Sequence, residues 1–344
     1  MAVAKIGDKT VGDGSPVFIS FEAGATHTGL ESAKRLCQAS AEAGADAVKF
    51  QTMRADDLLL DDEIQIEYQT FEGKKSESVY HALKRRELTF EEWHELKAYC
   101  DNLGILFIST PSGAETVDWL VEMNVSAIKV SKSDINYRLL IDYIATQSLP
   151  VIIDSREKVE DIEEAIRICE NHGLRDIVIM HCPSGYPAEY AGVHLNAIPY
   201  IRRVFNYPVG YSDHSVGTAM NFAAVGIGTD LIEKTITENR AVDAVEHYMS
   251  LEISDLKSFV DEIRMVESAL GTPRAIFNSR VKSEHRRSIL ATRTIMKGKR
   301  ISLDDLDFKR PGTKIPVDMY GEVIGRIAAK NIPADTFLNF RDLI

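Results

Sequence analysis

Polar and charged side chains follow the ends of several short apolar runs in this sequence. These positions are Glu22 and His27, Lys49 and Gln51, Ser109 and Thr110, Lys129 and Lys132, Asp154 and Ser155, His181 and Cys182, Ser212, Asp213 and His214, and Glu233 and Lys234. Several lysines that converge on one site would bind an anionic substrate, because ammonium groups stabilise carboxylate and phosphate. The alternative is that the lysines pair with the neighbouring carboxylates and only stabilise the fold.

Histidine and hydroxyl side chains add further candidates. His214, in the string YSDHS, is the best metal-ligand candidate, because neutral imidazole beside a carboxylate suits a divalent transition ion. A hydrogen-bonded structural histidine is an equally good interpretation. Ser184 and Tyr186, in the turn CPSGYP, suit hydroxyl contacts to a sugar or phosphate, although a plain turn is the alternative. Glu246 follows the last apolar run and could be a ligand, a sugar-binding group or part of a helix start.

The apolar runs themselves predict buried parallel strands. They cover residues 17–23, 47–52, 106–111, 127–132, 150–155, 177–182, 208–213 and 231–236. Segments with helical periodicity separate them, and the one over 89–104 begins with a capping box of Thr89 and Glu92. Eight such units predict a (β/α)8 barrel, in which the chemistry lies at the carboxyl ends of the strands. Residues 53–88 form a long connection that we expect to cover the active site.

Composition excludes several classes of protein. The 344 residues carry a net charge of −12 and are 27% charged and 44% hydrophobic, which is typical of a soluble globular protein. An acidic chain without a long basic run argues against nucleic acid, although Lys84, Arg85 and Arg86 form a local spot compatible with a small anion. We find neither a membrane-length apolar stretch nor a signal peptide. The four cysteines lack a CxxC pair, so we expect reduced thiols and a cytoplasmic location.

The pattern changes after Gly271. We expect a barrel domain over residues 1–271, a polar and basic linker over 272–287, and a small β-rich domain over 288–344. The last domain contains two turn-like repeats, Ile295–Gly298 and Ile332–Asp335, with Pro and Gly between short strands. A domain of about 57 residues is marginally stable by itself. We therefore expect it to pack on the barrel or on a partner's barrel.

Several strings together resemble the NeuB family of sialic acid synthases and their relatives, which make legionaminic and pseudaminic acids or spore-coat sugars. The strings are FEAGATHTG (21–29), EAGADAVKFQT (42–52), LKRRELTFEEWHELKAYCDNLGILFISTP (83–111), HCPSGYP (181–187), GYSDHSVG (210–217), IEK (232–234) and SLE (250–252). The string KRPGTKIP (309–316) is similar to the antifreeze-like SAF domain that ends this family. The resemblance covers nearly the whole chain in the right order.

This resemblance implies an activity. Phosphoenolpyruvate would condense with an open-chain N-acylmannosamine-type sugar and release phosphate, while Mn²⁺ or Mg²⁺ polarises the aldehyde. It also implies a domain-swapped homodimer, in which Arg310 of one SAF domain reaches the N-acyl group of the sugar in the other subunit. We expect no nucleic acid or membrane partner.

By position, the resemblance also implies roles for individual residues. Catalytic roles fall to Glu22, Lys49, Lys129, Asp213 and Glu233, and substrate contacts to Gln51, Lys132, Ser155, Ser184, Tyr186, Ser212, Glu246 and Arg310, with His214 as metal ligand.

Departures from the family pattern fall in the expected site. Thr235 stands at the position of the second metal histidine, and Lys132 replaces a phosphate-contacting serine. The family's STGM turn reads Asp154-Ser155-Arg156-Glu157, and its NHNG string reads THTG (26–29). Because threonine is a poor transition-metal ligand, one hypothesis is a metal-weakened or metal-independent synthase in which Lys132 supports the phosphate or polarises the aldehyde. Others are a different acceptor sugar, a paralogue that binds sugar acids without condensing them, and a lyase or aldolase that uses Lys129 or Lys132 as a Schiff base.

Overall fold

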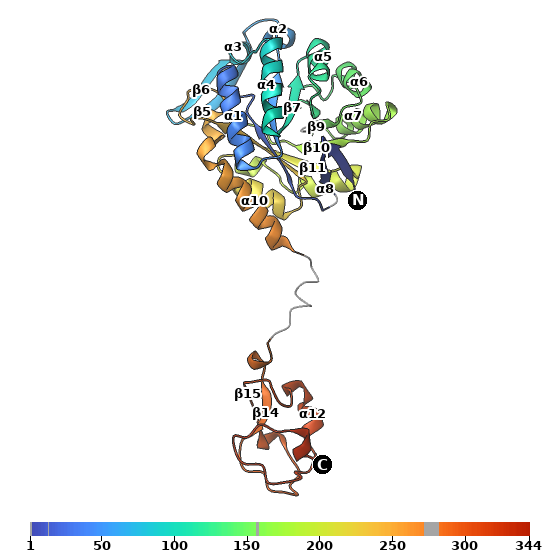
Figure 1. The fold of residues 1–344 in the computed structure, drawn as a ribbon, viewed down its shortest axis with the longest axis vertical. Coiled ribbons are helices and arrows are strands. Elements are labelled where there is room, and N and C mark those ends of the chain that lie inside the picture. The colour runs from blue at the N-terminus through green and yellow to red at the C-terminus, as the bar shows by residue number, and fades with distance from the viewer. Residues whose placement is uncertain (1, 13, 156–157, 272–281) are drawn as a thin grey trace. The chain divides into compact units, whose positions relative to one another are not determined.

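The computed structural model describes residues 2–12, 14–155, 158–271 and 282–344. The chain divides into two compact units, Met1–Leu270 and Gly271–Ile344 (Figure 1). Residues 272–281 of the expected linker, and Arg156 and Glu157 of the charged turn, lie outside the described residues. Within the described ranges, no helix is both long and apolar enough to cross a membrane.

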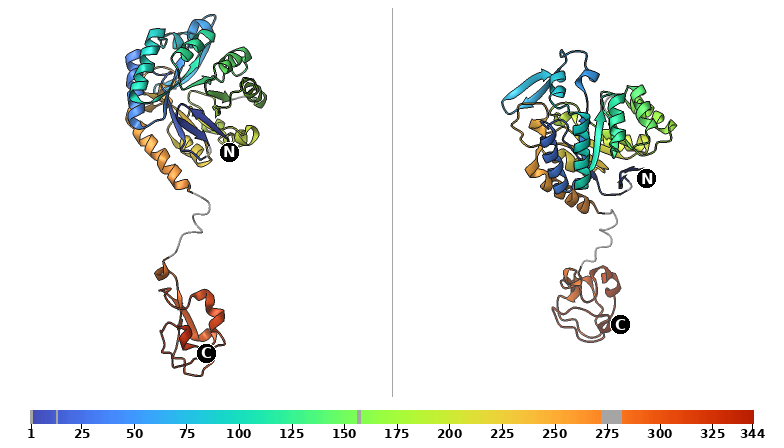
Figure 2. Two further views of the ribbon diagram at one scale, coloured as in Figure 1. Left: turned by 45° about the vertical axis from the view of Figure 1, so that its right-hand side comes forward. Right: turned by 45° about the horizontal axis from the view of Figure 1, so that its top comes forward.

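The first unit is a closed parallel barrel (Figures 1 and 2). Its strands are β3 (Phe18–Glu22), β4 (Ala47–Thr52), β7 (Leu106–Pro111), β8 (Ala127–Val130), β9 (Val151–Ser155), β10 (Ile177–His181), β11 (Val209–Asp213) and β12 (Leu231–Thr237). Strand β12 pairs with both β11 and β3, which closes the ring. The predicted (β/α)8 barrel is therefore confirmed, and each predicted strand is present within two residues at either end.

Helices surround the barrel. They are α1 (Leu30–Ala43), α4 (Phe90–Leu103), α5 (Ala114–Glu122), α6 (Arg138–Thr146), α7 (Val159–Asn171), α8 (Ala197–Phe205), α9 (Ala219–Gly226) and α10 (Leu256–Leu270). Short elements between them are η1 (Tyr190–Gly192), η2 (His247–Met249), β13 (Leu251–Glu252) and η3 (Ile253–Asp255). Helix α4 begins as its sequence predicts, because the Thr89 hydroxyl accepts from the Glu92 amide at 3.2 Å and the Glu92 carboxylate accepts from the Thr89 amide at 2.8 Å. It ends at Gly104, whose φ of 71° suits glycine.

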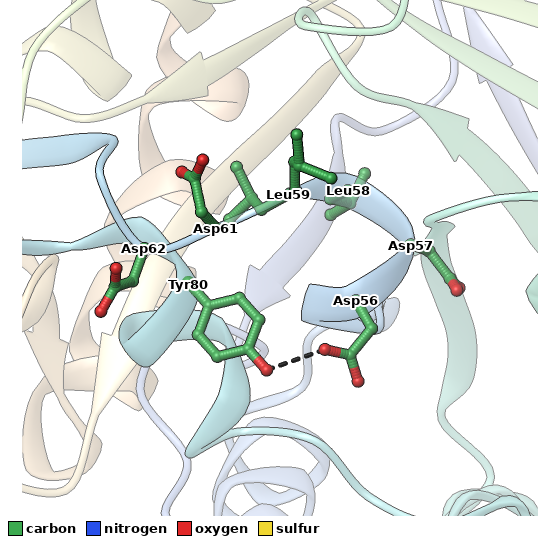
Figure 3. Close-up of a pocket in the computed structure, with 8 residues that line it drawn as sticks. Asp56, Asp57, Leu58, Leu59, Asp61, Asp62 and Tyr80 are labelled. Carbon is green, nitrogen blue, oxygen red and sulfur yellow. Dashed lines mark hydrogen bonds between the residues drawn. The ribbon is translucent and has the colours of Figure 1, made fainter.

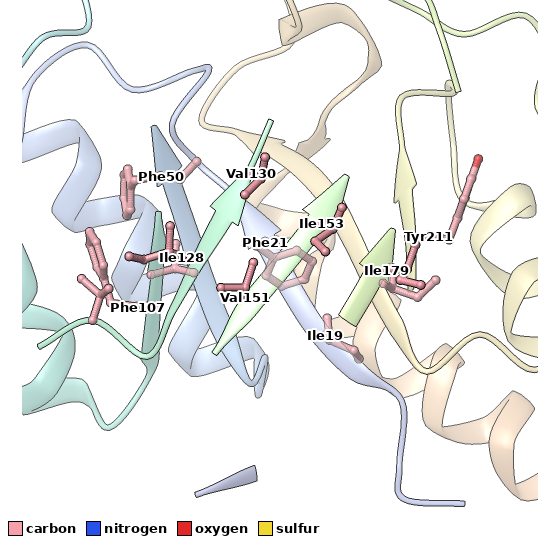
Figure 4. Close-up of a cluster of buried hydrophobic side chains, with 14 of the residues drawn as sticks. Ile19, Phe21, Phe50, Phe107, Ile128, Val130, Val151, Ile153, Ile179 and Tyr211 are labelled. Atoms are coloured by element: carbon pink, nitrogen blue, oxygen red, sulfur yellow. The ribbon is translucent and has the colours of Figure 1, made fainter. Parts of the chain in front are cut away.

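Alternation along the strands creates two apolar layers. Ile19 and Phe21 of β3 point outward and pack under the helices, together with Phe50, Phe107 and Tyr211 (Figure 4). A second cluster fills the barrel interior near the amino ends of the strands. It contains Phe18, Ala47, Ile108, Ala127, Ile152, Val178, Met180 and Leu231. The hairpin of β1 (Val3–Ile6) and β2 (Lys9–Gly12) covers this inner cluster with Ala4, Ile6 and Val11. The sequence pattern alone does not predict this hairpin.

The connection after β4 is a folded insertion rather than a loose loop. It contains α2 (Ala55–Leu58), the antiparallel hairpin of β5 (Gln65–Thr70) and β6 (Gly73–Ser78), and α3 (Val79–Lys84). A small apolar cluster of Tyr68, Ala82 and Val245 joins it to the loop after β12. The Gln69 amide also donates to the Tyr186 carbonyl at 2.9 Å, which ties the hairpin to the loop after β10. These contacts hold the insertion against the carboxyl ends of the strands.

The second unit is small and has its own core. It contains η4 (Ser283–His285), β14 (Ser288–Ala291), η5 (Leu303–Asp305), β15 (Leu306–Lys309), η6 (Val317–Met319), α12 (Tyr320–Val323) and η7 (Phe340–Asp342). Strands β14 and β15 pair antiparallel. The two turn-like repeats meet directly, since Ile295 and Ile332 exchange backbone hydrogen bonds of 2.8 Å. Both isoleucines are buried in one apolar cluster.

Trp93 of α4 provides a test of the outer core. Its side chain is 1% exposed and packs edge-on against Phe50, with ring centroids 5.8 Å apart, and against His27 at 6.2 Å. We expect Trp93→Ala to lower the free energy of unfolding by about 3–5 kcal/mol, because it removes a large buried aromatic side chain. Urea unfolding measures this loss. Half-buried Trp119 is the matched control, and an equal loss for Trp119→Ala would contradict the assignment.

Candidate functional site

Strand alternation places one set of charged residues inside the barrel mouth. On β3, Phe18 faces the inner cluster, so Ser20 and Glu22 face the same way further along the strand. The same alternation directs inward residues from six other strands, and together they line a cavity of about 550 Å³, which we call the mouth pocket. Its lining includes Glu22, Lys49, Gln51, Lys129, Lys132, Asp154, Tyr186, Ser212, His214, Glu233 and Glu246. Most of the predicted site residues therefore share one pocket.

The buried lysines in this pocket are paired with carboxylates. Lys129 Nζ lies 2.7 Å from Glu233 Oε1 and 3.4 Å from Asp154 Oδ2. Lys49 forms an ion pair with Glu22, and Gln51 approaches the same carboxylate. These ionic side chains are less than 10% exposed, so each charge needs its partner to offset the loss of water.

The acidic residues of the mouth pocket have pKa values shifted in opposite directions. Burial favours the neutral acid, but Lys129 and Lys49, and hydrogen bonds from Lys129 and Ser212, lower the Glu233 pKa to about 2. Burial raises the pKa of Glu22 despite the attraction of Lys49. Burial and repulsion from Glu22 raise the pKa of Glu246. One pocket thus combines an ionised carboxylate with carboxyl groups that hold a proton more readily, which is the arrangement that acid–base chemistry requires.

Glu246 also has an unusual backbone. Its φ of 72° lies in the left-handed region, which non-glycine residues adopt rarely and at an energetic cost. Its carboxylate accepts a hydrogen bond from the Thr235 hydroxyl at 3.3 Å. The surrounding structure therefore holds this acidic side chain in a defined place in the pocket.

Lys132 has a different environment from the other pocket lysines. Its Nζ atom is buried, and no acceptor within hydrogen-bond distance belongs to the described part of the chain. The ammonium lies 5.3 Å from the centroid of the Tyr186 ring, and that ring stacks on His214 with centroids 5.1 Å apart. A cation–π contact compensates only part of the lost hydration. The pocket thus presents one ammonium group that is open to an anionic ligand.

The donor set does not fit a divalent transition ion. In the described residues, no three His, Cys, Asp or Glu side chains form a group that could hold a metal. His214 lines the pocket and its Nδ1 atom is buried without a partner, but Thr235 stands on the neighbouring strand where a second imidazole would be useful. Burial and the nearby ammonium of Lys132 also lower the pKa of His214. A cation fixed beside the imidazole disfavours a second cation there.

Three site residues that the resemblance assigns in the first unit, Asp213, Ser155 and Ser184, do not line the mouth pocket. Asp213 and Lys234 point outward from their strands and form a buried pair of 2.7 Å, with Asn221 of α9 donating to the same carboxylate at 2.5 Å. Ser155 donates to the Met180 carbonyl at 2.8 Å. Exposed Ser184 lines a neighbouring hollow of about 740 Å³. Arg310 is exposed in the second unit.

Arg86 lines the mouth pocket, although the sequence analysis did not assign it there. The sequence predicts only that the basic string 84–86 is compatible with a small anion. The basic string was the sequence signal that could have pointed to Arg86. Its three side chains, however, have different environments. Lys84 pairs with Asp56 at 2.9 Å and Arg85 pairs with Glu77, whereas Arg86 faces the pocket. Spacing in the sequence does not show which of three adjacent cations faces inward.

A further hollow lies on the insertion and is lined by acidic side chains. Asp56, Asp57, Asp61 and Asp62 line it together with Tyr80, whose hydroxyl donates to Asp56 at 2.7 Å (Figure 3). Its volume is about 640 Å³. An acidic, open hollow repels anionic substrates, so the mouth pocket remains the candidate site.

The Glu233 carboxylate predicts a pH-dependent contribution to stability. Its pKa falls from the ordinary 4.5 to about 2 on folding, so its contribution of about 3 kcal/mol is complete above pH 4.5 and disappears as the pH falls toward 2. We expect Glu233→Gln to be less stable than the wild type at pH 7, with a difference that shrinks between pH 4.5 and 3. Urea unfolding at each pH measures the difference.

The control for this series is Glu63→Gln, at an exposed position on the insertion. We expect it to change stability by less than about 0.5 kcal/mol at any pH. A Glu233→Gln difference that stays constant from pH 7 to 3 would contradict the assigned ion pair.

Because the residues present do not fit a divalent ion, we predict that two substitutions would create a metal site. Asp213 and Lys234 are register partners on β11 and β12, so the next residues, His214 and Thr235, lie side by side. We expect the double variant Lys132→Ser/Thr235→His to bind Mn²⁺ at least about tenfold tighter than the wild type, because it adds an imidazole and removes a competing cation. Electron paramagnetic resonance of free Mn²⁺ measures the affinity, and Lys132→Ser is the control. A wild type that binds Mn²⁺ as tightly as the double variant would contradict the assignment.

Comparison with known proteins supports the resemblance. An uncharacterized protein of Methanocaldococcus jannaschii is 38% identical over 100% of this chain and 99% of its own. The N,N'-diacetyllegionaminic acid synthase of Legionella pneumophila is 34% identical over 96% of both chains. The structure of the spore coat polysaccharide biosynthesis protein SpsE of Bacillus subtilis superposes with a TM-score of 0.69 and 32% identity, covering 100% of this chain and 99% of the other. Residues 36–275 match the NeuB family and residues 286–344 match the SAF domain, so this chain belongs to the NeuB family and ends in a SAF domain.

Proposed function

We propose that this chain condenses phosphoenolpyruvate with an N-acylmannosamine-type sugar to form a sialic-acid-like nonulosonic acid and phosphate. The observation that carries the proposal is the open ammonium of Lys132 in the same pocket as ionised Glu233 and as Glu22 and Glu246, whose pKa values are raised. Membership of the NeuB family supports it, since relatives in this family include legionaminic and pseudaminic acid synthases.

Phosphoenolpyruvate would occupy the end of the pocket near Lys132. Its phosphate and carboxylate bring charge into a place where Lys129 and Lys49 are already paired, so the uncommitted ammonium is the strongest anchor. Tyr186 and Ser212 lie in the same lining and supply hydroxyl groups. The resemblance also assigns substrate contacts to Ser155 and Ser184. Their side chains lie outside this pocket, so these two contacts stay predictions.

The reaction forms a carbon–carbon bond and a bond between C2 and the oxygen of water, and it breaks the bond between C2 and the phosphate oxygen. C3 of phosphoenolpyruvate attacks the aldehyde carbon, and the aldehyde oxygen takes a proton from a carboxyl group with a raised pKa, Glu22 or Glu246. Glu233, as an anion, stabilises the positive charge that develops at C2 and accepts a proton from the attacking water. The tetrahedral adduct then expels phosphate, which carries away the proton of the C2 hydroxyl as C2 becomes a ketone. Asp213 would act only by positioning, through its pair with Lys234.

Finer expectations from the resemblance remain proposals. These are the cytoplasmic location and the domain-swapped homodimer with Arg310 reaching the sugar of the other subunit, whereas the divalent ion that the resemblance implies at His214 is not proposed. The proposed reaction steps use only side chains, because the donor set does not fit the ion. Turnover in EDTA tests the ion, and size-exclusion chromatography with light scattering tests the dimer.

Phosphate release tests the proposed function. We expect release only when phosphoenolpyruvate is combined with an N-acyl sugar, such as N-acetylmannosamine or its 2,4-diacetamido-2,4,6-trideoxy relative, and we expect release to persist in EDTA. Lys132→Met should raise the KM for phosphoenolpyruvate about 10- to 100-fold by removing a charged hydrogen-bond donor. Lys129→Met should lower kcat about 100-fold or more, because it removes a charge that positions Glu233.

Lys97→Met is the matched control for these variants. Lys97 is also a buried lysine paired with a carboxylate, Asp101 at 2.7 Å, but it lies on α4 and not in the mouth pocket. We expect it to leave both constants within about twofold of the wild type. No phosphate release with any N-acyl sugar would overturn the proposed function, and a borohydride-trapped substrate adduct on Lys132 would favour a Schiff-base lyase instead.

A further inference from the structure

Arg86 is a partly buried cation that the proposed reaction does not use. Its Nε donates to the Ala82 carbonyl at 2.8 Å, which fixes the guanidinium against the end of α3. Its Nη1 is buried and has no hydrogen-bond partner in the described ranges. An unsatisfied, buried donor on a charged group is costly unless a ligand supplies the acceptor. The guanidinium is therefore pre-positioned to donate to an oxygen atom in the mouth pocket.

The wall around Arg86 differs from the wall around Lys132. Arg86 follows α3 of the insertion, and the insertion also contributes the apolar lining residues Leu58, Leu59, Ile64, Ile66, Val79, Ala82 and Leu83. Lys132 follows β8 and contacts Tyr186. Glu246 lies within electrostatic reach of both cations. If phosphoenolpyruvate binds at Lys132, Arg86 and the insertion wall are left for the acceptor sugar.

The charges near Arg86 indicate the kind of group it binds. Glu246 and Glu22 both attract the guanidinium, so its charge is already partly balanced. A further anion would be repelled by these two carboxylates, whereas a neutral carbonyl oxygen would not. The aliphatic side chains that the insertion contributes to the same pocket suit a methyl or other small apolar group. An acyl amide has both features, because it carries a neutral carbonyl oxygen next to a small apolar group.

We propose that Arg86 binds the carbonyl oxygen of an N-acyl group on the acceptor sugar and thereby selects N-acyl sugars over plain hexoses. The inference rests on the proposed function for the order of the two substrates. It assigns acyl recognition to a residue of the barrel unit itself, in addition to any contact made by Arg310. Arg86 is then a specificity-determining residue and takes no part in bond making.

Calorimetric titration of the full chain tests this assignment without requiring turnover. In the absence of phosphoenolpyruvate, so that no condensation takes place, we expect the wild type to bind N-acetylmannosamine or its diacetamido relative at least about tenfold tighter than mannose. Arg86→Met should lose about 10- to 100-fold in affinity for the acyl sugar, and change its affinity for mannose and for phosphoenolpyruvate by less than about threefold. Arg86→Lys should recover part of the loss, because it restores a charged donor without the planar fork.

Arg85→Met is the control for loosening of the insertion. Arg85 pairs with Glu77 on the same segment but does not line the pocket, so we expect this variant to keep the acyl preference. Melting curves verify that each variant is folded. The inference is overturned if Arg86→Met keeps the wild-type preference, if Arg85→Met loses it equally, or if the wild type shows no preference. An acyl preference that depends on Arg86 without any phosphate release would instead refute the proposed function and leave this inference standing.

Discussion

The pairing of charge inside the barrel mouth is the constraint on which the rest of this structure depends. Lys129, Glu233 and Asp154 are removed from water together, and none of them could be buried there without the others. Parallel strands make this possible, because alternation brings inward side chains from adjacent strands to the same level. The helices, the outer core and the N-terminal hairpin all serve to keep those strands in register.

The pairing of some pocket cations with carboxylates also indicates where ligands bind. Lys49 and Lys129 have carboxylate partners, whereas Lys132 Nζ and Arg86 Nη1 have no hydrogen-bond partner in the described chain. The two open donors come from different segments, the loop after β8 and the insertion after β4. A site for two substrates needs such a division, with an anion at one cation and a neutral acceptor at the other. Glu246, held in a left-handed conformation, lies within the influence of both.

Much of the fold and part of the site could be predicted from the sequence. The strands were predictable because both of their faces are buried, and period-two alternation places Glu22 and Glu233 inside. The same alternation places Asp213 outside, which the motif did not reveal, so its pair with Lys234 became clear only from the structure. The inward position of Arg86 depends on how the insertion folds over the mouth, and local patterns do not encode that packing. The mismatch of Thr235 with a metal site was visible in the sequence, and the structure adds the neighbouring ammonium.

A crystal structure of the full-length Lys129→Met variant with phosphoenolpyruvate and N-acetylmannosamine would test the central claim most directly. The substitution slows turnover, so both substrates remain bound. The account predicts an oxygen of the phosphate or carboxylate within hydrogen-bond distance of Lys132 Nζ. The sugar should lie on the insertion side of the pocket, with its acyl oxygen at Arg86. Phosphoenolpyruvate bound without any contact to Lys132, or bound outside the mouth pocket, would contradict the account.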